Sequence, residues 1–207
     1  MTHFETSEPI EEKSPEHLIT PANLLTAARP VMALEVAHRI ATGRRHTTAL
    51  MLATVATDAE GTVARLVEKA APNSGYGLTE LGAAIDPIAD SMAFMEIAAG
   101  ALVGRRVSLL GKLGVGLVVA TEGVKAKWAV KANAKHKAET GERLVIKPSG
   151  LGKAATDFKF AALFSAVRTH ELEPGTERTV WGIASLATAA VGTVLGEKAR
   201  RSYQNSL

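Results

Sequence analysis

Two short acidic stretches of this sequence hold side chains that could bind a metal ion and a phosphate group. In the second stretch, Asp86 and Asp90 lie four residues apart, so a helix places them on one face, one turn apart. Two like charges in this arrangement destabilise a helix unless a cation lies between them. Carboxylate oxygens are the ligands that Mg²⁺ and Mn²⁺ prefer. The spacing predicts a divalent cation site, and the alternative is a pair of carboxylates on a solvated helix face.

The first acidic stretch, residues 57–65, adds residues that suit a phosphate ligand. Glu60 supplies a carboxylate, with Asp58 beside it, and Gly61 allows a ligand to approach the backbone closely. Arg65 supplies a cation one turn further on. Carboxylates, a metal ion and an arginine together favour a bound diphosphate, whereas an ordinary solvated helix face is the alternative.

The elements that must position these residues are predicted to be helices. Of the 207 residues, 46% are hydrophobic and only 4% are aromatic, and the apolar runs lack the turn spacing of hairpins. Ala, Gly, Ser and Thr are frequent among the Leu and Val residues, and small residues let helices approach closely within a bilayer. The apolar regions are 23–43, 47–69, 81–104, 107–124, 150–167 and 179–196.

These regions predict an all-α fold, an integral membrane bundle of about six transmembrane helices. Only the region 179–196 is an uncharged run long enough to span a bilayer, about 18 residues. The other regions carry ionisable residues, which at membrane depth would face the interior and mark a functional site. Residues 1–20 are expected to form a polar tail, residues 21–200 the membrane domain and residues 201–207 a C-terminal tail. The alternative is a soluble helical interaction protein without a site.

Charge and composition narrow the function further. The chain has no cysteine, which excludes disulfides, thiol nucleophiles and cysteine-ligated zinc. A net charge of +3 is too small to indicate nucleic-acid binding, so we expect no nucleic-acid partner. Six spans with both termini inside place Lys69, the basic segment 125–147 and Lys198 on the cytoplasmic side, in line with the positive-inside rule.

The order of these motifs resembles the CDP-alcohol phosphatidyltransferase family. That family carries the pattern D-x2-D-G-x2-A-R-x8-G-x3-D-x3-D across its second and third membrane helices. Gly82, Asp86 and Asp90 match its second half in full, and Gly61, Ala64 and Arg65 match part of its first half. Further similar stretches are Asn23–Arg29, which resembles N-x-L-T-x2-R, and Gly150–Thr156, which resembles G-K-x-K-T.

The sequence departs from the family pattern in three places. Thr57 stands where the first Asp is usual, and Glu60 replaces the second. The link from Arg65 to Gly82 is longer than in the family. Ala155 replaces the second Lys of the G-K-x-K-T stretch. These departures leave the first half of the metal-binding motif incomplete and the second half intact.

The resemblance implies a role for each matching residue. It implies a two-metal site with Mg²⁺ or Mn²⁺, in which Asp90 also acts as the general base; its ligands would be Asp58, Glu60, Asp86 and Asp90. Gly61, Arg65 and Gly82 would bind the CDP moiety. Arg29 and Lys153 would attract a phosphorylated acceptor or anionic lipid headgroups.

The function expected from this resemblance is the transfer of a phosphatidyl group from CDP-diacylglycerol to an alcohol acceptor, with release of CMP. Glycerol 3-phosphate is the first expected acceptor; inositol phosphate and phosphatidylglycerol stay open. The site would face the cytoplasm, membrane lipids would surround the protein, and a homodimer is implied. The alternative is a non-catalytic family member that binds lipid or CDP-lipid without turnover.

Overall fold

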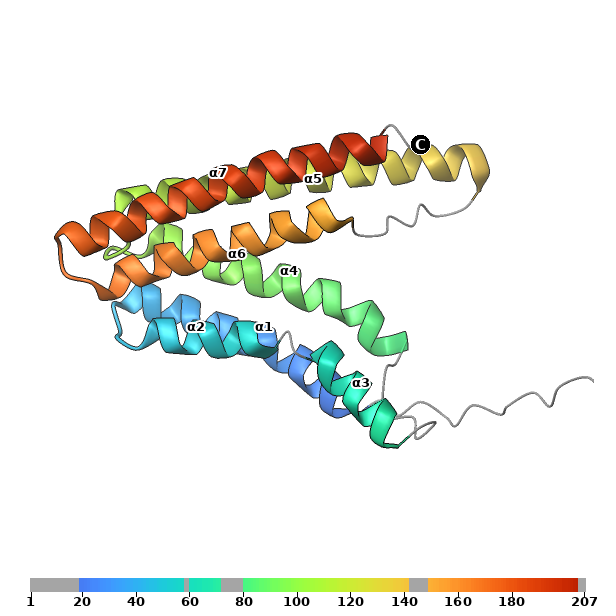
Figure 1. The fold of residues 1–207 in the computed structure, drawn as a ribbon, viewed down its shortest axis with the longest axis horizontal. Coiled ribbons are helices and arrows are strands. Elements are labelled where there is room, and N and C mark those ends of the chain that lie inside the picture. The colour runs from blue at the N-terminus through green and yellow to red at the C-terminus, as the bar shows by residue number, and fades with distance from the viewer. Residues whose placement is uncertain (1–18, 58–59, 72–79, 142–148, 205–207) are drawn as a thin grey trace, which may run out of the picture.

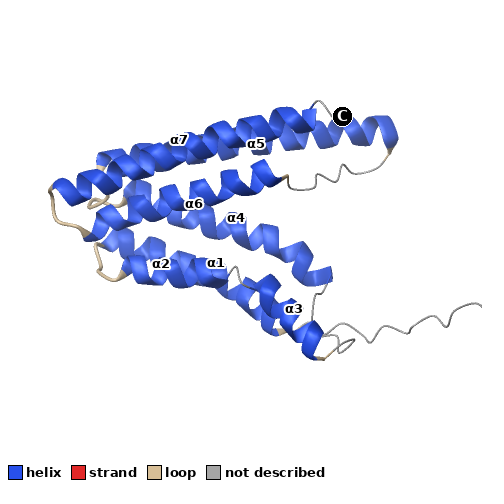
Figure 2. Cartoon of the chain, viewed as in Figure 1, coloured by secondary structure: helices blue, strands red, loops and turns tan. Residues whose placement is uncertain are grey.

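The computed structural model describes residues 19–57, 60–71, 80–141, 149–204, and it is all-helical over these ranges, as predicted. The helices, shown in Figures 1 and 2, are α1 (Pro21–Thr42), α2 (Thr47–Ala56), α3 (Glu60–Ala70), α4 (Glu80–Val103), α5 (Leu109–Thr140), α6 (Gly150–Glu171) and α7 (Thr176–Gln204). Of these helices, α7 alone is long and apolar enough to cross a membrane by the criterion of length and composition, with a mean hydropathy of 1.5.

Side-chain caps explain where several helices begin and end. Thr20, Ser108 and Ser149 are the N-cap residues of α1, α5 and α6, and each hydroxyl accepts a backbone N–H three residues later. Gly43 ends α1 at φ +77°, a left-handed conformation that glycine adopts without steric cost. Because these caps depend on residues near each helix end, α1, α5 and α6 begin within two residues of the predicted positions.

The structure differs from the predicted elements in three ways. The helix α7 continues beyond the predicted region 179–196 to Gln204. The region 47–69 is divided at Thr57 into α2 and α3. The first part of the basic segment, residues 125–140, continues the helix of the apolar region, so α5 extends without a break to Thr140. At 1.5 Å per residue its 32 residues extend about 48 Å, which exceeds the hydrocarbon thickness of a bilayer, about 30 Å.

Glycines bring the helices of the bundle into close contact. A Cβ atom added at Gly100 of α4 would lie 2.6 Å from Cα of Ala37 in α1, so glycine is required for this approach. Similarly, Gly114 of α5 packs against the backbone of Ser185 in α7. Figure 1 shows α5, α6 and α7 packed together and α1 beside α4, while α2 lies against α1 and α6.

Both small and large apolar residues fill the centre of the bundle, and further large apolar residues face outward. Seven alanines belong to the buried core cluster: Ala33, Ala93, Ala98, Ala101, Ala162, Ala166 and Ala189. By contrast, Val31 is 69% exposed, Ile88 60% and Leu109 73%. Large apolar side chains therefore lie both in the buried core and on the surface of the bundle.

Candidate functional site

A buried arginine connects three of the four sequence segments in which site residues were predicted. Arg29 of α1 is 3% exposed. Its Nε donates to the Thr57 hydroxyl at 3.1 Å, and its Nη2 donates to the Thr57 carbonyl at 3.2 Å. Its Nη1 donates to Oδ1 of Asp86 at 3.0 Å and also to Oδ1 of Asp90. Three nitrogens of one guanidinium group therefore join α1, the end of α2 and the first half of α4.

The Asp86 and Asp90 carboxylates converge, as the four-residue spacing predicted. Both side chains are partly exposed, 35% and 41%, whereas the Arg29 side chain is 4% exposed. The guanidinium group of Arg29 thus supplies the positive charge that compensates the two carboxylates. Among the described residues, one guanidinium group contacts two carboxylates.

Thr57, the residue that follows the last residue of α2, is hydrogen-bonded to both α1 and α2. Its hydroxyl donates to the carbonyl of Thr54 at 2.6 Å and accepts from Arg29. Its backbone carbonyl, which lies at the end of α2 and so has no partner within that helix, also accepts from Arg29. Thr57 stands where the pattern of the CDP-alcohol phosphatidyltransferases has an aspartate. At this position Arg29 therefore has a neutral hydrogen-bond partner.

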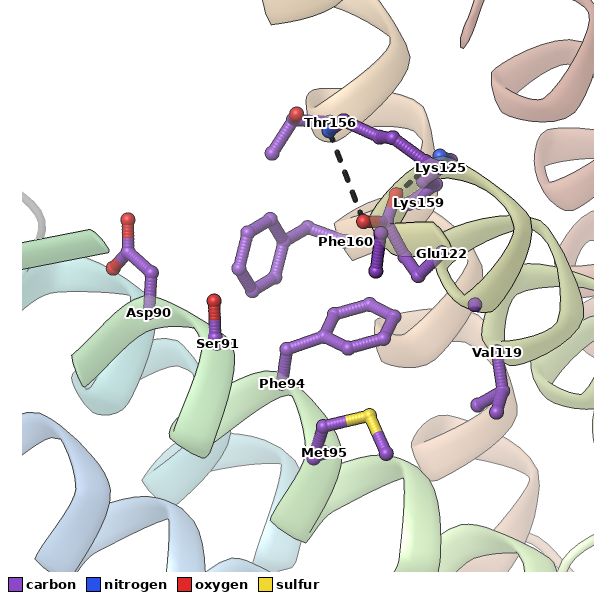
Figure 3. A pocket seen from close by; sticks show the side chains of 12 residues that line it. Asp90, Ser91, Phe94, Met95, Val119, Glu122, Lys125, Thr156, Lys159 and Phe160 are labelled. Carbon is purple, nitrogen blue, oxygen red and sulfur yellow. Dashed lines mark hydrogen bonds and ion pairs between the residues drawn. The ribbon is translucent and has the colours of Figure 1, made fainter. Parts of the chain in front are cut away.

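A pocket of about 550 Å³ begins at Asp90 and extends between α4, α5 and α6. Figure 3 shows Phe94 and Phe160 inside it, with Met95 and Val119 forming more of the apolar wall. The two phenylalanine rings meet edge to face with centroids 6.1 Å apart. Thus a large apolar surface lies directly beside a carboxylate.

Charged residues of α5 and α6 line the wall of this pocket away from Asp90. The Nζ of Lys159, a residue only 4% exposed, lies 2.5 Å from Oε1 of Glu122. The Nζ of Lys125 lies 3.7 Å from Oε2 of the same carboxylate. Figure 3 shows the contact between Lys159 and Glu122 as a dashed line. Two ammonium groups share one carboxylate, so this wall carries a net charge of +1.

Several predicted site residues stand apart from this cluster or cannot be placed in it. Asp58 lies outside the described residues. Glu60 and Gly61 belong to the first turn of α3 and Gly82 to that of α4, but their surroundings are outside the described part too. Arg65 of α3 and Lys153 of α6 are exposed, and neither lines the pocket. Their predicted roles in substrate binding stay predictions.

Glu122 and Lys159 were not among the site residues predicted from the sequence. Glu122 is an acidic residue within an apolar run, which by itself was a signal for a functional position at membrane depth. Lys159 lies one turn beyond Ala155, the residue that replaces the usual lysine, so both lie on the same face of α6. Its partner Glu122 is 37 residues away in sequence, so no local pattern could indicate the pair.

The oxygen atoms of Asp86 and Asp90 are the right kind of ligand for a divalent cation, but two side chains supply fewer ligands than such a site needs. Both are carboxylate oxygens, the donors that Mg²⁺ and Mn²⁺ prefer. Over the described residues, however, no group of three or more acidic or histidine side chains converges. Direct binding of a metal ion to both Oδ1 atoms requires Arg29 to release them, because Nη1 contacts both.

Comparisons with family models, curated proteins and solved structures give no match to this chain.

Proposed function

We propose first that the chain is a multi-pass membrane protein whose helices span the bilayer as a bundle of about six. The support is the distribution of side chains. Every helix except α6 presents at least one large apolar side chain that is more than half exposed, examples being Leu24, Leu52, Leu66, Met95, Leu113 and Ile183. A soluble monomer rarely exposes so much apolar surface, whereas a bundle in lipid requires it.

The orientation proposed puts the candidate site on the cytoplasmic side. In Figure 1, α3, the starts of α4 and α6 and the ends of α5 and α7 lie at one end of the bundle. The exposed lysines at the end of α5 lie there and favour this side: Lys125, Lys127, Lys131, Lys135 and Lys137. Trp128 stacks on Tyr203 at the same end, with ring centroids 6.5 Å apart, as expected of interfacial aromatic residues.

Since the chain has no cysteine, single cysteines test this topology directly. Arg105, at the opposite end of the bundle, and Lys131 are both exposed. A membrane-impermeant maleimide should label Arg105→Cys in intact cells and Lys131→Cys only after permeabilisation. Equal labelling of both variants in intact cells would exclude the proposed orientation.

We propose that the site transfers a phosphatidyl group from CDP-diacylglycerol to an alcohol acceptor. The observation that carries this proposal is the convergence on Arg29 of segments that resemble three separate family motifs. Arg29, Thr57 and the pair Asp86 and Asp90 belong to different helices or their ends, yet they form one hydrogen-bonded cluster. That cluster borders a pocket large enough for an organic ligand.

Each group then has a defined task in the transfer. When bound by Asp86 and Asp90, a divalent cation would neutralise charge on the diphosphate. Asp90 borders the pocket and accepts the proton of the acceptor hydroxyl. The hydroxyl oxygen forms a bond to the phosphorus that carries the diacylglycerol, and the bond from that phosphorus to the CMP oxygen breaks. CMP leaves with the electron pair of that bond.

A second candidate function is lipid or CDP-lipid binding without turnover. The observation that favours it is the contact of Arg29 with both Asp86 and Asp90, together with a threonine at position 57. An arginine that holds both carboxylates competes with a divalent cation for the same oxygens. This candidate retains the pocket and the membrane bundle but no metal-dependent chemistry.

CMP release separates the two candidates. The purified protein in liposomes is given CDP-diacylglycerol, Mg²⁺ or Mn²⁺, and acceptors led by glycerol 3-phosphate. We expect metal-dependent CMP release that Asp90→Asn abolishes and Asp157→Asn, an exposed position on α6, leaves unchanged. No release with any acceptor from folded protein would exclude the transferase and support the binding function.

A further inference from the structure

The pocket beside Asp90 has two walls of different chemistry. Phe94, Met95, Val119 and Phe160 present carbon and sulfur, while Lys159, Lys125 and Glu122 present charge. A small polyol phosphate would leave the apolar wall in contact with water or polar groups. An amphiphile satisfies both walls, because its apolar part covers one and its charged group meets the other.

The pocket is accessible from the outer apolar surface of the bundle. Met95 lines the pocket and is 52% exposed. Met92 and Ile88, one and two turns earlier on α4, are 49% and 60% exposed. Within a bilayer, this face of α4 contacts acyl chains, so a lipid could place its chains there and its headgroup in the pocket.

Glu122 limits the negative charge that the pocket can accept. Its carboxylate contacts Lys159 at 2.5 Å and Lys125 at 3.7 Å, which leaves a surplus of one positive charge on this wall. A singly charged phosphodiester balances that surplus. A doubly charged phosphate monoester adds a negative charge close to a carboxylate in a partly desolvated site, which is unfavourable.

We propose that Glu122 makes this pocket selective for a hydroxyl-bearing lipid with a single negative charge, whose phosphodiester contacts Lys159 and Lys125. This inference rests on the proposed transferase function and specifies its acceptor. The lipid hydroxyl lies toward Asp90 and its chains lie along Phe94 and Met95. A phosphodiester lipid is therefore preferred over glycerol 3-phosphate.

The test compares acceptors in phosphatidylcholine nanodiscs with and without phosphatidylglycerol, which serves as the phosphodiester lipid. Glycerol 3-phosphate is the dianionic probe, and glycerophosphoglycerol supplies the same phosphodiester without chains. We expect CMP release to be faster with phosphatidylglycerol than with either soluble probe. Glu122→Gln should shift the ratio of rates toward glycerol 3-phosphate by about tenfold, because one opposing charge is removed. The control is Glu139→Gln, which removes an exposed carboxylate that pairs with Lys135 on the same helix. It should leave the ratio of rates unchanged.

Binding is measured separately from turnover, as the shift of the thermal unfolding midpoint that phosphatidylglycerol produces. Lys159→Met should remove most of this shift, and Glu122→Gln, which retains both lysines, should retain it. A preference of the unmodified protein for glycerol 3-phosphate, an unchanged ratio in Glu122→Gln, or equal rates with glycerophosphoglycerol would overturn the inference. Lysine-dependent binding without CMP release for any acceptor would refute the transferase function and leave a lipid site.

Discussion

The Nη1 atom of Arg29 lies 3.0 Å from Oδ1 of Asp86, although the two residues are 57 positions apart in the sequence. This contact joins α1 to α4 and gives the acidic helix face an internal cation. Because the same nitrogen also contacts Asp90, both carboxylates depend on one guanidinium group. Both the stability of the bundle at this point and the metal affinity of the site should depend on Arg29.

Removal of the Arg29 charge should destabilise the protein and make its stability depend on metal ions. Arg29→Gln leaves two carboxylates without a cation, at a cost of about 1–3 kcal/mol, since both acids are partly exposed. A divalent cation should then restore the unfolding midpoint, measured in detergent with Mg²⁺ or with chelator. Arg39→Gln, which breaks a pair with Glu35 on the same helix, should show no response to metal.

Introduction of an acidic residue at position 57 should release the carboxylates of α4. Thr57→Asp places a carboxylate beside Nε and Nη2 of Arg29, which should draw the guanidinium away from Asp86 and Asp90. We expect tighter Mn²⁺ binding, measured by electron paramagnetic resonance. Thr57→Ser retains the hydroxyl and should bind Mn²⁺ as the unmodified protein does. Equal affinities of Thr57→Asp and Thr57→Ser would show that Arg29 does not control access of the metal.

The close contact between α1 and α4 should not tolerate a side chain at position 100. In Gly100→Ala the new Cβ would lie 2.6 Å from a backbone atom of Ala37, so the helices must separate, at a cost of about 1–3 kcal/mol. Gly116→Ala is the matched control, because no atom lies within 4 Å of its added Cβ. Since alanine favours helices, this control should be stabilised by roughly 0.5–1 kcal/mol. Thermal unfolding in detergent measures both, and similar midpoints would exclude tight packing at Gly100.

Glu197, just beyond the predicted last span, should remain ionised in strong acid. Arg200 and then Arg201 donate hydrogen bonds to its carboxylate and lower its pKa from 4.5 to about 2. Because the folded-state pKa is depressed, the stabilising effect is present above pH 4.5 and is lost as the pH falls toward 2. Carbon-13 NMR of the glutamate carboxyl should give the low midpoint, and Arg200→Gln combined with Arg201→Gln should raise it. An unchanged midpoint in the double variant would exclude these hydrogen bonds as the cause.

Much of the fold was predictable because helices depend on residues three or four positions apart. The apolar regions became helices, and Asp86 and Asp90 share a face as their spacing required. The division at Thr57 and the continuation of α5 to Thr140 were not predicted. Thr57 contacts α1 rather than its sequence neighbours alone, and the basic segment contains good helix formers, alanine and lysine, that continue the helix outside the apolar run.

The pattern of residues along the chain was enough to predict that the chain is helical and that Asp86 and Asp90 converge, because helical periodicity brings residues i and i+4 together. It also indicated that a cation must accompany that pair. The packing of the helices shows that this cation is Arg29, and that Lys159 pairs with Glu122 beside the pocket. These pairs join different helices, so they depend on which faces pack together and on glycines such as Gly100 that permit the approach. Helix-to-helix packing is a property of the whole chain, and no local spacing encodes it.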